Sequence, residues 1–244
     1  MARRRRCFLE GVPLHVIFRG NGRQDIFRRE GDRHFFREIL LEGIRKRGIA
    51  IHAYVFMSNH VHLLATPEGP ESLPGFFRSM GARYVPYFNK PLSRTGGLLE
   101  DRYKSIFVRD GEYLIRCMRY IELNPVRAGI VDDPLAYPWS SCRANALGRA
   151  DDLVTPHSTY IGLGSSPDTH HVAYRALFNP EIDQEVAISI RKALQEGWAY
   201  GDDAFLLWTG KASGLGRKLS QIEGQIEGQS PGEGDCPPGK GTVP

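Results

Sequence analysis

The segment spanning residues 51–67, IHAYVFMSNHVHLLATP, constrains the fold of this 244-residue chain more than any other stretch. Two runs of apolar and β-branched residues flank the short polar pair Ser58-Asn59, which predicts two strands joined by a tight turn. Because side chains alternate faces along a strand, His60 and His62 are expected on one face and the apolar residues next to them on the other. A single cation can bridge two imidazoles placed in this way. The segment therefore predicts a β-hairpin that carries half of a metal site.

Apolar residues at helical spacing, with turn residues at their ends, predict the other elements of the chain. Strands are predicted over residues 13–19 and 103–108, and helices over residues 31–47, 73–89, 112–124, 181–196 and 203–208. Gly48 is expected to stop the first helix, Pro86 to break or kink the second, and Pro125 to end the third. The order of elements predicts an α+β sandwich of ferredoxin-like kind, with an antiparallel sheet and helices on one face. The other face is left for a ligand or for the third helix.

Composition divides the chain into three predicted regions. Residues 1–150 hold the predicted sandwich, and residues 151–218 form a small helical extension. Residues 219–244 contain a doubled QIEG and little that could build a core, which predicts a disordered tail. Trp139 is expected to pack an irregular segment back on the sandwich. The chemistry is therefore expected within residues 1–150.

Charge is unevenly distributed along the chain. The net charge is +4, but arginine is concentrated near the front, above all in Arg3, Arg4, Arg5 and Arg6. This favours a polyanionic partner, although an ordinary solvated face explains the charge equally well. No apolar run is long enough to cross a membrane or to act as a secretory signal, so we expect a cytoplasmic protein. The four scattered cysteines form no CxxC pair and are expected to be free thiols.

The third predicted helix offers partners for the histidines. In residues 113–124, YLIRCMRYIELN, apolar residues form a buried stripe, while Tyr120 and Asn124 are spaced i, i+4 and share a neighbouring face. An amide oxygen one turn from a phenol could complete a three-ligand cation site with the two imidazoles. A cation there would polarise a phosphodiester and activate the phenol, whose attack would give a phosphotyrosine intermediate and a free 3′-hydroxyl. The spacing is equally consistent with Tyr120 as a rim residue and Asn124 as the helix end before a proline.

Six segments of the chain are similar, in the same order, to segments of a known family. They are RGNGRQDIF (residues 19–27), YVFMSNHVHLL (54–64), RYVPYFN (83–89), EDRYKS (100–105), RYIELNPVRAGIV (119–131) and YPWSSCRAN (137–145). Over about residues 3–150 the chain closely resembles the REP-associated tyrosine transposases, which are single-tyrosine HUH transposases. Their motif is two histidines around a hydrophobic residue.

This resemblance implies a fold, a chemistry and a partner. The fold would be an RRM-like α/β sandwich, in agreement with the predicted sheet. His60 and His62 would form the HUH pair, Tyr120 would be the nucleophile and Asn124 the polar third ligand. The cofactor would be a divalent cation, Mg²⁺ or Mn²⁺, and the partner single-stranded or hairpin DNA. The oligomeric state is left open between a monomer and a homodimer.

Basic and aromatic side chains are the expected DNA contacts. Residues 3–6 are expected to enter a groove or to follow phosphates as a flexible arm. The basic residues expected at the DNA backbone near the cut are Arg83, Arg102 and Lys104. The aromatic residues that could stack on unpaired bases are Tyr84, Tyr87 and Tyr103. Core packing is expected for at least one of these three.

Three functions are compared on this basis. The leading hypothesis is a metal-dependent DNA transposase or nickase that cleaves and rejoins hairpin DNA through Tyr120. The alternative is a domesticated protein that binds such hairpins without cutting them. A cupin-like metal enzyme is disfavoured, because that fold needs a glutamate shortly after the histidine pair, and Thr66 occupies the fourth position past His62.

Overall fold

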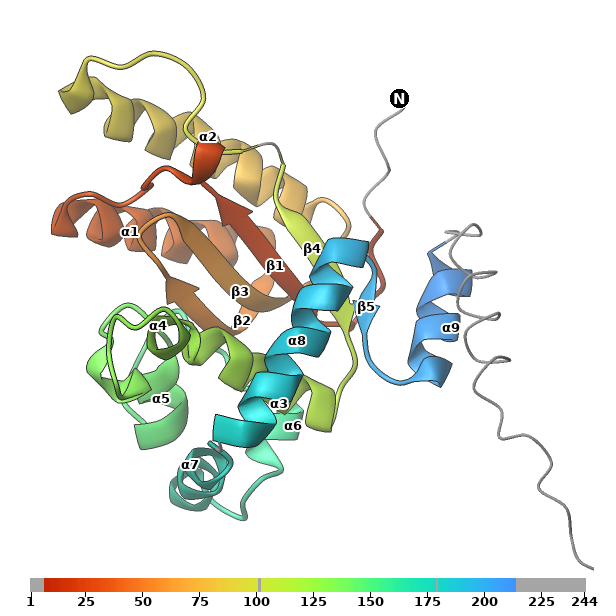
Figure 1. Cartoon of the computed structure of the whole chain (residues 1–244). Helices are drawn as coiled ribbons and strands as arrows, with labels where there is room; N and C mark the ends of the chain where they lie inside the picture. Colours follow the sequence, from red (N-terminus) through yellow and green to blue (C-terminus); the bar gives the residue numbers. More distant parts are fainter. Residues whose placement is uncertain (1–6, 101, 179, 214–244) are drawn as a thin grey trace, which may run out of the picture. The chain divides into compact units, whose positions relative to one another are not determined.

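The computed structural model describes residues 7–100, 102–178 and 180–213 (Figure 1). Its five-stranded sheet has the order β2-β3-β1-β4-β5. The strands are β1 (Leu14–Arg19), β2 (Ile49–Phe56), β3 (His60–Pro67), β4 (Lys104–Val108) and β5 (Ala199–Tyr200). The first four strands pair antiparallel, whereas β5 pairs parallel with β4. The predicted α+β sandwich is confirmed, with one short strand that the sequence did not reveal.

The described residues also form helices of very different length. The longer ones are α1 (Glu30–Arg47), α2 (Ser72–Asn89), α3 (Glu112–Glu122), α7 (Pro167–Ala176), α8 (Pro180–Glu196) and α9 (Asp203–Ala212). The shorter ones are α4 (Asn124–Arg127), α5 (Cys142–Leu147) and α6 (Ser158–Ile161), together with the 3₁₀ turns η1 (Asn21–Arg23), η2 (Lys90–Leu92) and η3 (Pro134–Ala136). Gly48 ends α1 as predicted, because its left-handed φ of 58° costs a glycine little.

One face of the sheet packs against α1 and α2. Phe36 of α1 places its ring centroid 5.8 Å from Phe18 of β1, 5.2 Å from Phe56 of β2 and 5.4 Å from Tyr84 of α2. All four side chains are buried. Val61 of β3 lies opposite Phe18 in the strand pairing and therefore shares this face. The apolar side of the predicted hairpin is thus buried against helices.

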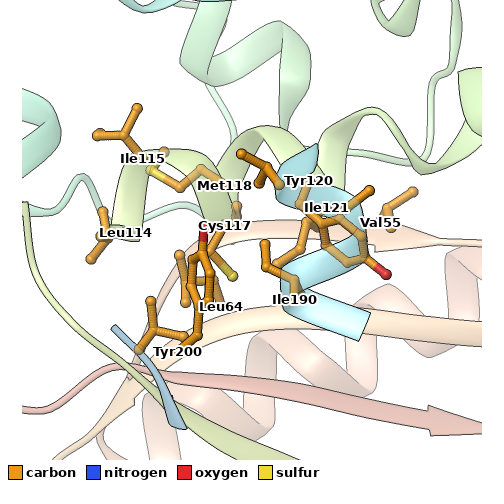
Figure 2. Packing of buried hydrophobic residues seen from close by; sticks show 14 of the residues in the cluster. Val55, Leu64, Leu114, Ile115, Cys117, Met118, Tyr120, Ile121, Ile190 and Tyr200 are labelled. Carbon is orange, nitrogen blue, oxygen red and sulfur yellow. The ribbon is translucent and has the colours of Figure 1, made fainter. Parts of the chain in front are cut away.

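The opposite face packs against α3, and α8 crosses α3 on the outside (Figure 1). Figure 2 shows Cys117 and Ile121 of α3 pointing towards the sheet, where they meet Leu64 and Val55, while Ile190 of α8 closes the cluster. The helices thus cover both faces, and α3 takes the place that the sequence left for a ligand or for the third helix. The helical stripe predicted for α3 is confirmed.

Two prolines behave differently from expectation. Pro86 does not end α2, which continues to Asn89 although the proline removes one hydrogen bond of the helix. Pro125 follows the end of α3, as predicted, but it also opens α4, where its missing N–H would have had no helical partner. α3 and α4 therefore meet at Leu123, which caps one and starts the other.

The chain forms a compact unit up to Gly201. The Tyr54 hydroxyl donates to Asp151 at 2.6 Å, and the Thr155 N–H donates to the Ile51 carbonyl at 2.7 Å, so the start of the extension is bonded to β2. Trp139 confirms its predicted packing, since its carbonyl accepts from the Phe56 N–H at 2.9 Å. The domain boundary at residue 150 stays a prediction.

The structure tests only some of the remaining sequence predictions. α9 belongs to a second unit that starts at Asp202, and the predicted tail, residues 219–244, lies outside the described residues. Cys117 and Cys142 carry free thiols, as predicted, whereas Cys236 is outside the described part. No helix among the described residues is long and apolar enough to span a membrane.

Candidate active site

The HUH pair, His60 and His62, stands at the beginning of β3, directly after the hairpin turn. The two ring centroids are 5.0 Å apart. His60 is half-buried, and burial lowers its pKa to about 4, with a further decrease from the positive charge of Arg19. His62 is buried, and its pKa lies well below the ordinary value, first through desolvation and then through the neighbouring imidazoles of His15 and His60 and the positive charge of Arg127. Both imidazoles are therefore neutral near pH 7, as metal ligands must be.

Hydrogen bonds at Nδ1 orient both rings of the HUH pair. The Nδ1 atom of His60 lies 2.6 Å from the Asn59 side-chain oxygen, which can only accept, so the proton sits on Nδ1 and Nε2 keeps its lone pair. The Nδ1 atom of His62 lies 2.8 Å from Nε2 of His15 on β1. When His62 donates in that bond, its Nε2 also keeps a lone pair. The geometry thus leaves Nε2 of His60 available as a ligand, and Nε2 of His62 is available in the tautomer in which His62 is the donor.

His15 is the third histidine on this sheet face. It lies on β1 with its ring 5.0 Å from that of His62 in a stacked arrangement. It is completely buried, and desolvation lowers its pKa to about 3. Its Nδ1 is a buried nitrogen with no hydrogen-bond partner among the described residues. His15 is therefore a neutral residue whose contact with Nδ1 of His62 orients the His62 ring.

Tyr120 of α3 faces the same histidines. Its ring centroid lies 5.8 Å from that of His62 and 5.7 Å from that of His15, both in edge-on contact. Only 6% of the residue is exposed. Figure 2 shows the ring between Val55 and Ile190, with the hydroxyl turned away from the helix axis. The two faces predicted to meet, the HUH face of β3 and the Tyr120 face of α3, are therefore in contact.

Two arginines flank the Tyr120 ring. Burial raises the pKa of Tyr120, whereas Arg127 and Arg191 oppose that shift by their positive charges, and Arg191 also by a hydrogen bond. The guanidinium carbon of Arg127 lies 4.5 Å from the ring centroid, and the same group donates to the Tyr120 carbonyl. Arg127 comes from α4 and Arg191 from α8, so elements about seventy residues apart in sequence meet at one phenol.

Asn124, the predicted third ligand, begins α4 on the same side of α3. Its amide nitrogen donates to the carbonyls of Tyr120 at 2.9 Å and Ile121 at 3.2 Å. These bonds hold the side chain against the end of α3, and its oxygen is the atom that remains to ligate a cation. The structure thus places Asn124 directly after the helix that carries Tyr120, without a contact to the HUH pair.

Known proteins provide an independent comparison. Residues 9–124 match the family described as "Transposase IS200 like", and this segment contains the HUH pair, Tyr120 and Asn124. This part of the chain belongs to the IS200-like transposase family. IS200-like transposases are typically DNA-cleaving enzymes. None of the curated proteins matches the chain.

Two solved structures resemble this chain. A REP-associated tyrosine transposase bound to a REP hairpin has 21% sequence identity and a TM-score of 0.50, and the match covers 65% of this chain and 96% of that one. A putative transposase from Deinococcus radiodurans R1 has 19% identity and a TM-score of 0.35, with 50% and 96% of the two chains covered. The first likeness shows that the α+β fold of this chain is the fold of a REP-associated tyrosine transposase.

The basic residues predicted at the DNA backbone do not all lie beside Tyr120. Lys104 opens β4 opposite Ile17, whose other neighbour across the sheet is His62, so its side chain is on the HUH face. Arg83 lies on α2, over the opposite face, and pairs with Glu42 at 2.6 Å. Arg102 is exposed just before β4. Residues 3–6 lie outside the described part of the chain.

The three predicted stacking residues are engaged in packing. Tyr84 is 1% exposed and donates to the Ile26 carbonyl at 2.6 Å. The Tyr103 ring stacks on Phe77 with centroids 4.1 Å apart, and the Tyr87 ring lies 4.2 Å from that of Phe35. The expectation of core packing for at least one of them is confirmed.

Three residues at the site were missed by the sequence reading: His15, Arg127 and Arg191. His15 is a lone histidine in the apolar strand PLHVIFR, and no neighbouring residue in the sequence suggests a partner for it. The alternation of side chains along the strand indicates only which face it is on. Arg127 lies inside the family-like segment RYIELNPVRAGIV, which was the available signal. Nothing local in α8 indicates that Arg191 reaches α3.

IS200-like transposases generally depend on a metal ion. The described residues contain no group of three or more His, Cys, Asp and Glu side chains arranged for a metal. A cation would instead rely on the two neutral imidazoles, the Asn124 oxygen, and oxygens from water or substrate. Nitrogen and neutral oxygen donors leave the positive charge of a divalent cation uncompensated, which suits binding to a phosphate.

Proposed function

We propose that this chain is a divalent-metal-dependent DNA transposase or nickase that cleaves and rejoins single-stranded hairpin DNA through Tyr120. The observation that carries the proposal is the contact of the Tyr120 ring with the histidine face, at 5.8 Å from His62 and 5.7 Å from His15. The family of residues 9–124 supports the same chemistry. The REP hairpin bound by the similar solved structure supports hairpin DNA as the partner.

His60, His62 and Asn124 would hold the cation, the histidines through Nε2 and the asparagine through its side-chain oxygen. A bound Mg²⁺ or Mn²⁺ would polarise the phosphodiester and stabilise negative charge on its oxygens. His15 would act as a positioning residue, because its bond to Nδ1 fixes the orientation of His62. Asn59 would do the same for His60.

The covalent step would use the phenol of Tyr120. Its oxygen forms a bond to phosphorus while the bond from phosphorus to the 3′ oxygen breaks, which gives a phosphotyrosine and a 3′-hydroxyl. The phenolic proton passes to solvent, and the departing 3′ oxygen takes up a proton. Arg127 and Arg191 favour the phenolate, since their charges oppose the increase in pKa that burial imposes on Tyr120. A 3′-hydroxyl can attack the same ester in reverse, so rejoining requires no external energy source.

One observation favours the second candidate, a protein that binds DNA hairpins without cutting them. Tyr120 is 6% exposed, with Ile190 of α8 packed beside its ring (Figure 2). A phosphate must reach the hydroxyl from the small part that is accessible. In a non-cleaving protein the phenol would serve only to pack α3 against α8.

The test is a search for a covalent adduct. The full-length protein is incubated with single-stranded hairpin oligonucleotides drawn from the DNA flanking its gene, with Mg²⁺ or Mn²⁺, and resolved on a denaturing gel. We expect an adduct with the wild type that EDTA and Tyr120→Phe each abolish. Tyr113→Phe, on the same helix, is the matched control and keeps the adduct.

Two results would contradict this expectation in different ways. An adduct that persists in Tyr120→Phe would assign the nucleophile to another residue. Tight hairpin binding without any adduct in the wild type would establish the non-cleaving function instead.

A further inference from the structure

A cavity of about 780 Å³ lies next to Tyr120, where α3 ends. It is enclosed by α4, η3, α5, α7 and α8, all within the compact unit that ends at Gly201. Arg127 and Arg191, which flank the Tyr120 ring, both line it. The volume is in the range of pockets that bind drug-sized molecules, and a nucleotide is of that size. The cavity is therefore a ligand-sized space whose lining shares two arginines with the surroundings of the proposed nucleophile.

Its polar lining carries a small excess of positive charge. Arg127, Arg175 and Arg191 contribute three guanidinium groups, against the two exposed carboxylates of Asp132 and Asp133. Guanidinium groups bind phosphate through paired hydrogen bonds. The two arginines closest to Tyr120 are thus suited to a phosphate that follows the one under attack.

The rest of the lining is apolar and partly aromatic. Leu123, Val126 and Ala187 form part of the wall, together with the half-buried ring of Phe178. Ile188 is 60% exposed and lies at the solvent side of the cavity. A base that leaves its stack is stabilised by apolar walls and by stacking on an aromatic ring. The combination of guanidinium groups and a flat aromatic side chain matches a nucleotide better than a purely apolar ligand.

Six of the fifteen lining residues come from the helical extension. α4, η3 and α5 precede residue 150, whereas Arg175, Phe178 and the α8 residues follow it. The match to the IS200-like family ends at residue 124, so nearly the whole cavity lies beyond it. The extension thus adds a recognition surface next to a site that the family segment supplies.

We propose that this cavity binds one unpaired nucleotide of the DNA strand, adjacent to the phosphate that Tyr120 attacks. The base would lie against Phe178 and the apolar wall, and the neighbouring phosphate would contact Arg127 and Arg191. This inference rests on the proposed function, because DNA brings the nucleotide to the cavity.

The experiment measures binding without cleavage. Full-length protein in EDTA is titrated with fluorescent hairpins that carry single-stranded tails on both sides, in which each tail nucleotide in turn is made abasic. We expect one tail position at which loss of the base weakens wild-type binding about tenfold. Ile188→Trp, which obstructs the mouth of the cavity, should bind the intact tail about tenfold more weakly and should no longer distinguish the abasic position.

The matched control is Val172→Trp, a substitution on α7 at a residue that is 69% exposed and does not line the cavity. It should behave as the wild type. Arg175→Ala, a milder change at an exposed lining residue, should weaken binding of intact and abasic tails alike. Tolerance of every abasic position, or unchanged discrimination in Ile188→Trp, would overturn the inference.

The adduct assay on the same oligonucleotides separates this inference from the proposed function. If an adduct forms but no abasic position weakens binding, the nucleotide cavity is refuted and the proposed cleavage is not. An abasic effect that Ile188→Trp removes, without an adduct, would support the cavity in a protein that does not cut. Absence of hairpin binding would refute both.

Discussion

The two faces of the sheet are formed by the same strands but serve different purposes. On the α1/α2 face, buried aromatic rings such as Phe18, Phe36 and Phe56 pack at centroid distances of 5.2–5.8 Å. On the α3 face, side chains from the same strands alternate with them and include His15 and His62. One face is built mainly from groups that cannot titrate, and the other buries neutral imidazoles and a phenol. The difference shows that a hairpin can separate stability from chemistry by side-chain alternation alone.

The α3 face carries the larger free-energy cost of burial. Burial of a polar group is unfavourable unless hydrogen bonds replace its contacts with water. Glu122 of α3 meets this need with three donors: Ser141 at 2.6 Å, Asn145 at 2.7 Å and Tyr174 at 2.8 Å. This network joins α3 to α5 and α7. If the two faces have separate roles, substitutions on them should affect different measurements.

The largest effect is expected at the HUH pair. His62→Ala removes a proposed cation ligand and should lower adduct formation by more than about a thousandfold. Hairpin binding in EDTA should be largely kept, because it depends on phosphate and base contacts. His52→Ala is the matched control, since His52 is also a buried histidine of the hairpin but bonds to Thr155 and Thr66. Equal loss of binding and cleavage in His62→Ala would make the histidine structural.

The opposite face should respond in stability. Phe36→Ala leaves a cavity among Phe18, Phe56 and Tyr84, which should reduce the free energy of unfolding by about 3–5 kcal/mol. Denaturant titration measures this change. Adduct formation per folded molecule should stay close to that of the wild type. A specific loss of cleavage in the folded fraction would show that the two faces are coupled.

Glu122 tests the polar network of the α3 face through pH. Burial raises the pKa of Glu122 to about 7 in the folded protein, against an ordinary value near 4.5. Because the folded state favours the protonated form, this stabilisation is complete below the ordinary pKa and is lost as the pH rises through 7. Between about pH 5 and pH 6.5 the unfolding free energy should fall by about 2 kcal/mol.

Glu122→Gln should remove this pH dependence, since the amide stays neutral throughout. Glu112→Gln, an exposed position on the same helix, should keep the slope of the wild type. The measurement is denaturant unfolding at several pH values. A wild-type slope in Glu122→Gln would assign the pH dependence to other groups.

The smallest expected effect is on hairpin affinity, in a comparison of two basic residues on opposite faces. Lys104→Ala, on the HUH face, should reduce hairpin affinity severalfold and lower the slope of log affinity against log salt by about one. Arg83→Ala, on α2 and paired with Glu42, should leave both quantities unchanged. Salt titrations of hairpin binding measure both variants. An equal effect of the two substitutions would place DNA on both faces.

Much of this arrangement follows from local pattern. Strand alternation predicted the HUH face. Helical spacing predicted that Tyr120 and Asn124 share a neighbouring face of one helix, whereas in the structure Asn124 begins α4 directly after α3. The short elements α5, α7 and β5 escaped prediction, because two to ten residues carry too little periodicity to identify. Contacts between distant segments escaped for another reason. The residues around His15 give no sequence signal that it contacts His62, and those around Arg191 give none that it contacts Tyr120. Tertiary packing alone brings these side chains together.

The parallel pairing of β5 with β4 has a consequence for shortened versions of this protein. β4 borders the sheet on the side where Phe107 and Val108 meet Ala199 and Tyr200. A chain cut after residue 150 would leave that strand with unused backbone donors and acceptors on an apolar border. Such borders recruit strands from other molecules. The truncated protein should therefore self-associate, and its oligomers would misrepresent how the intact chain behaves in solution.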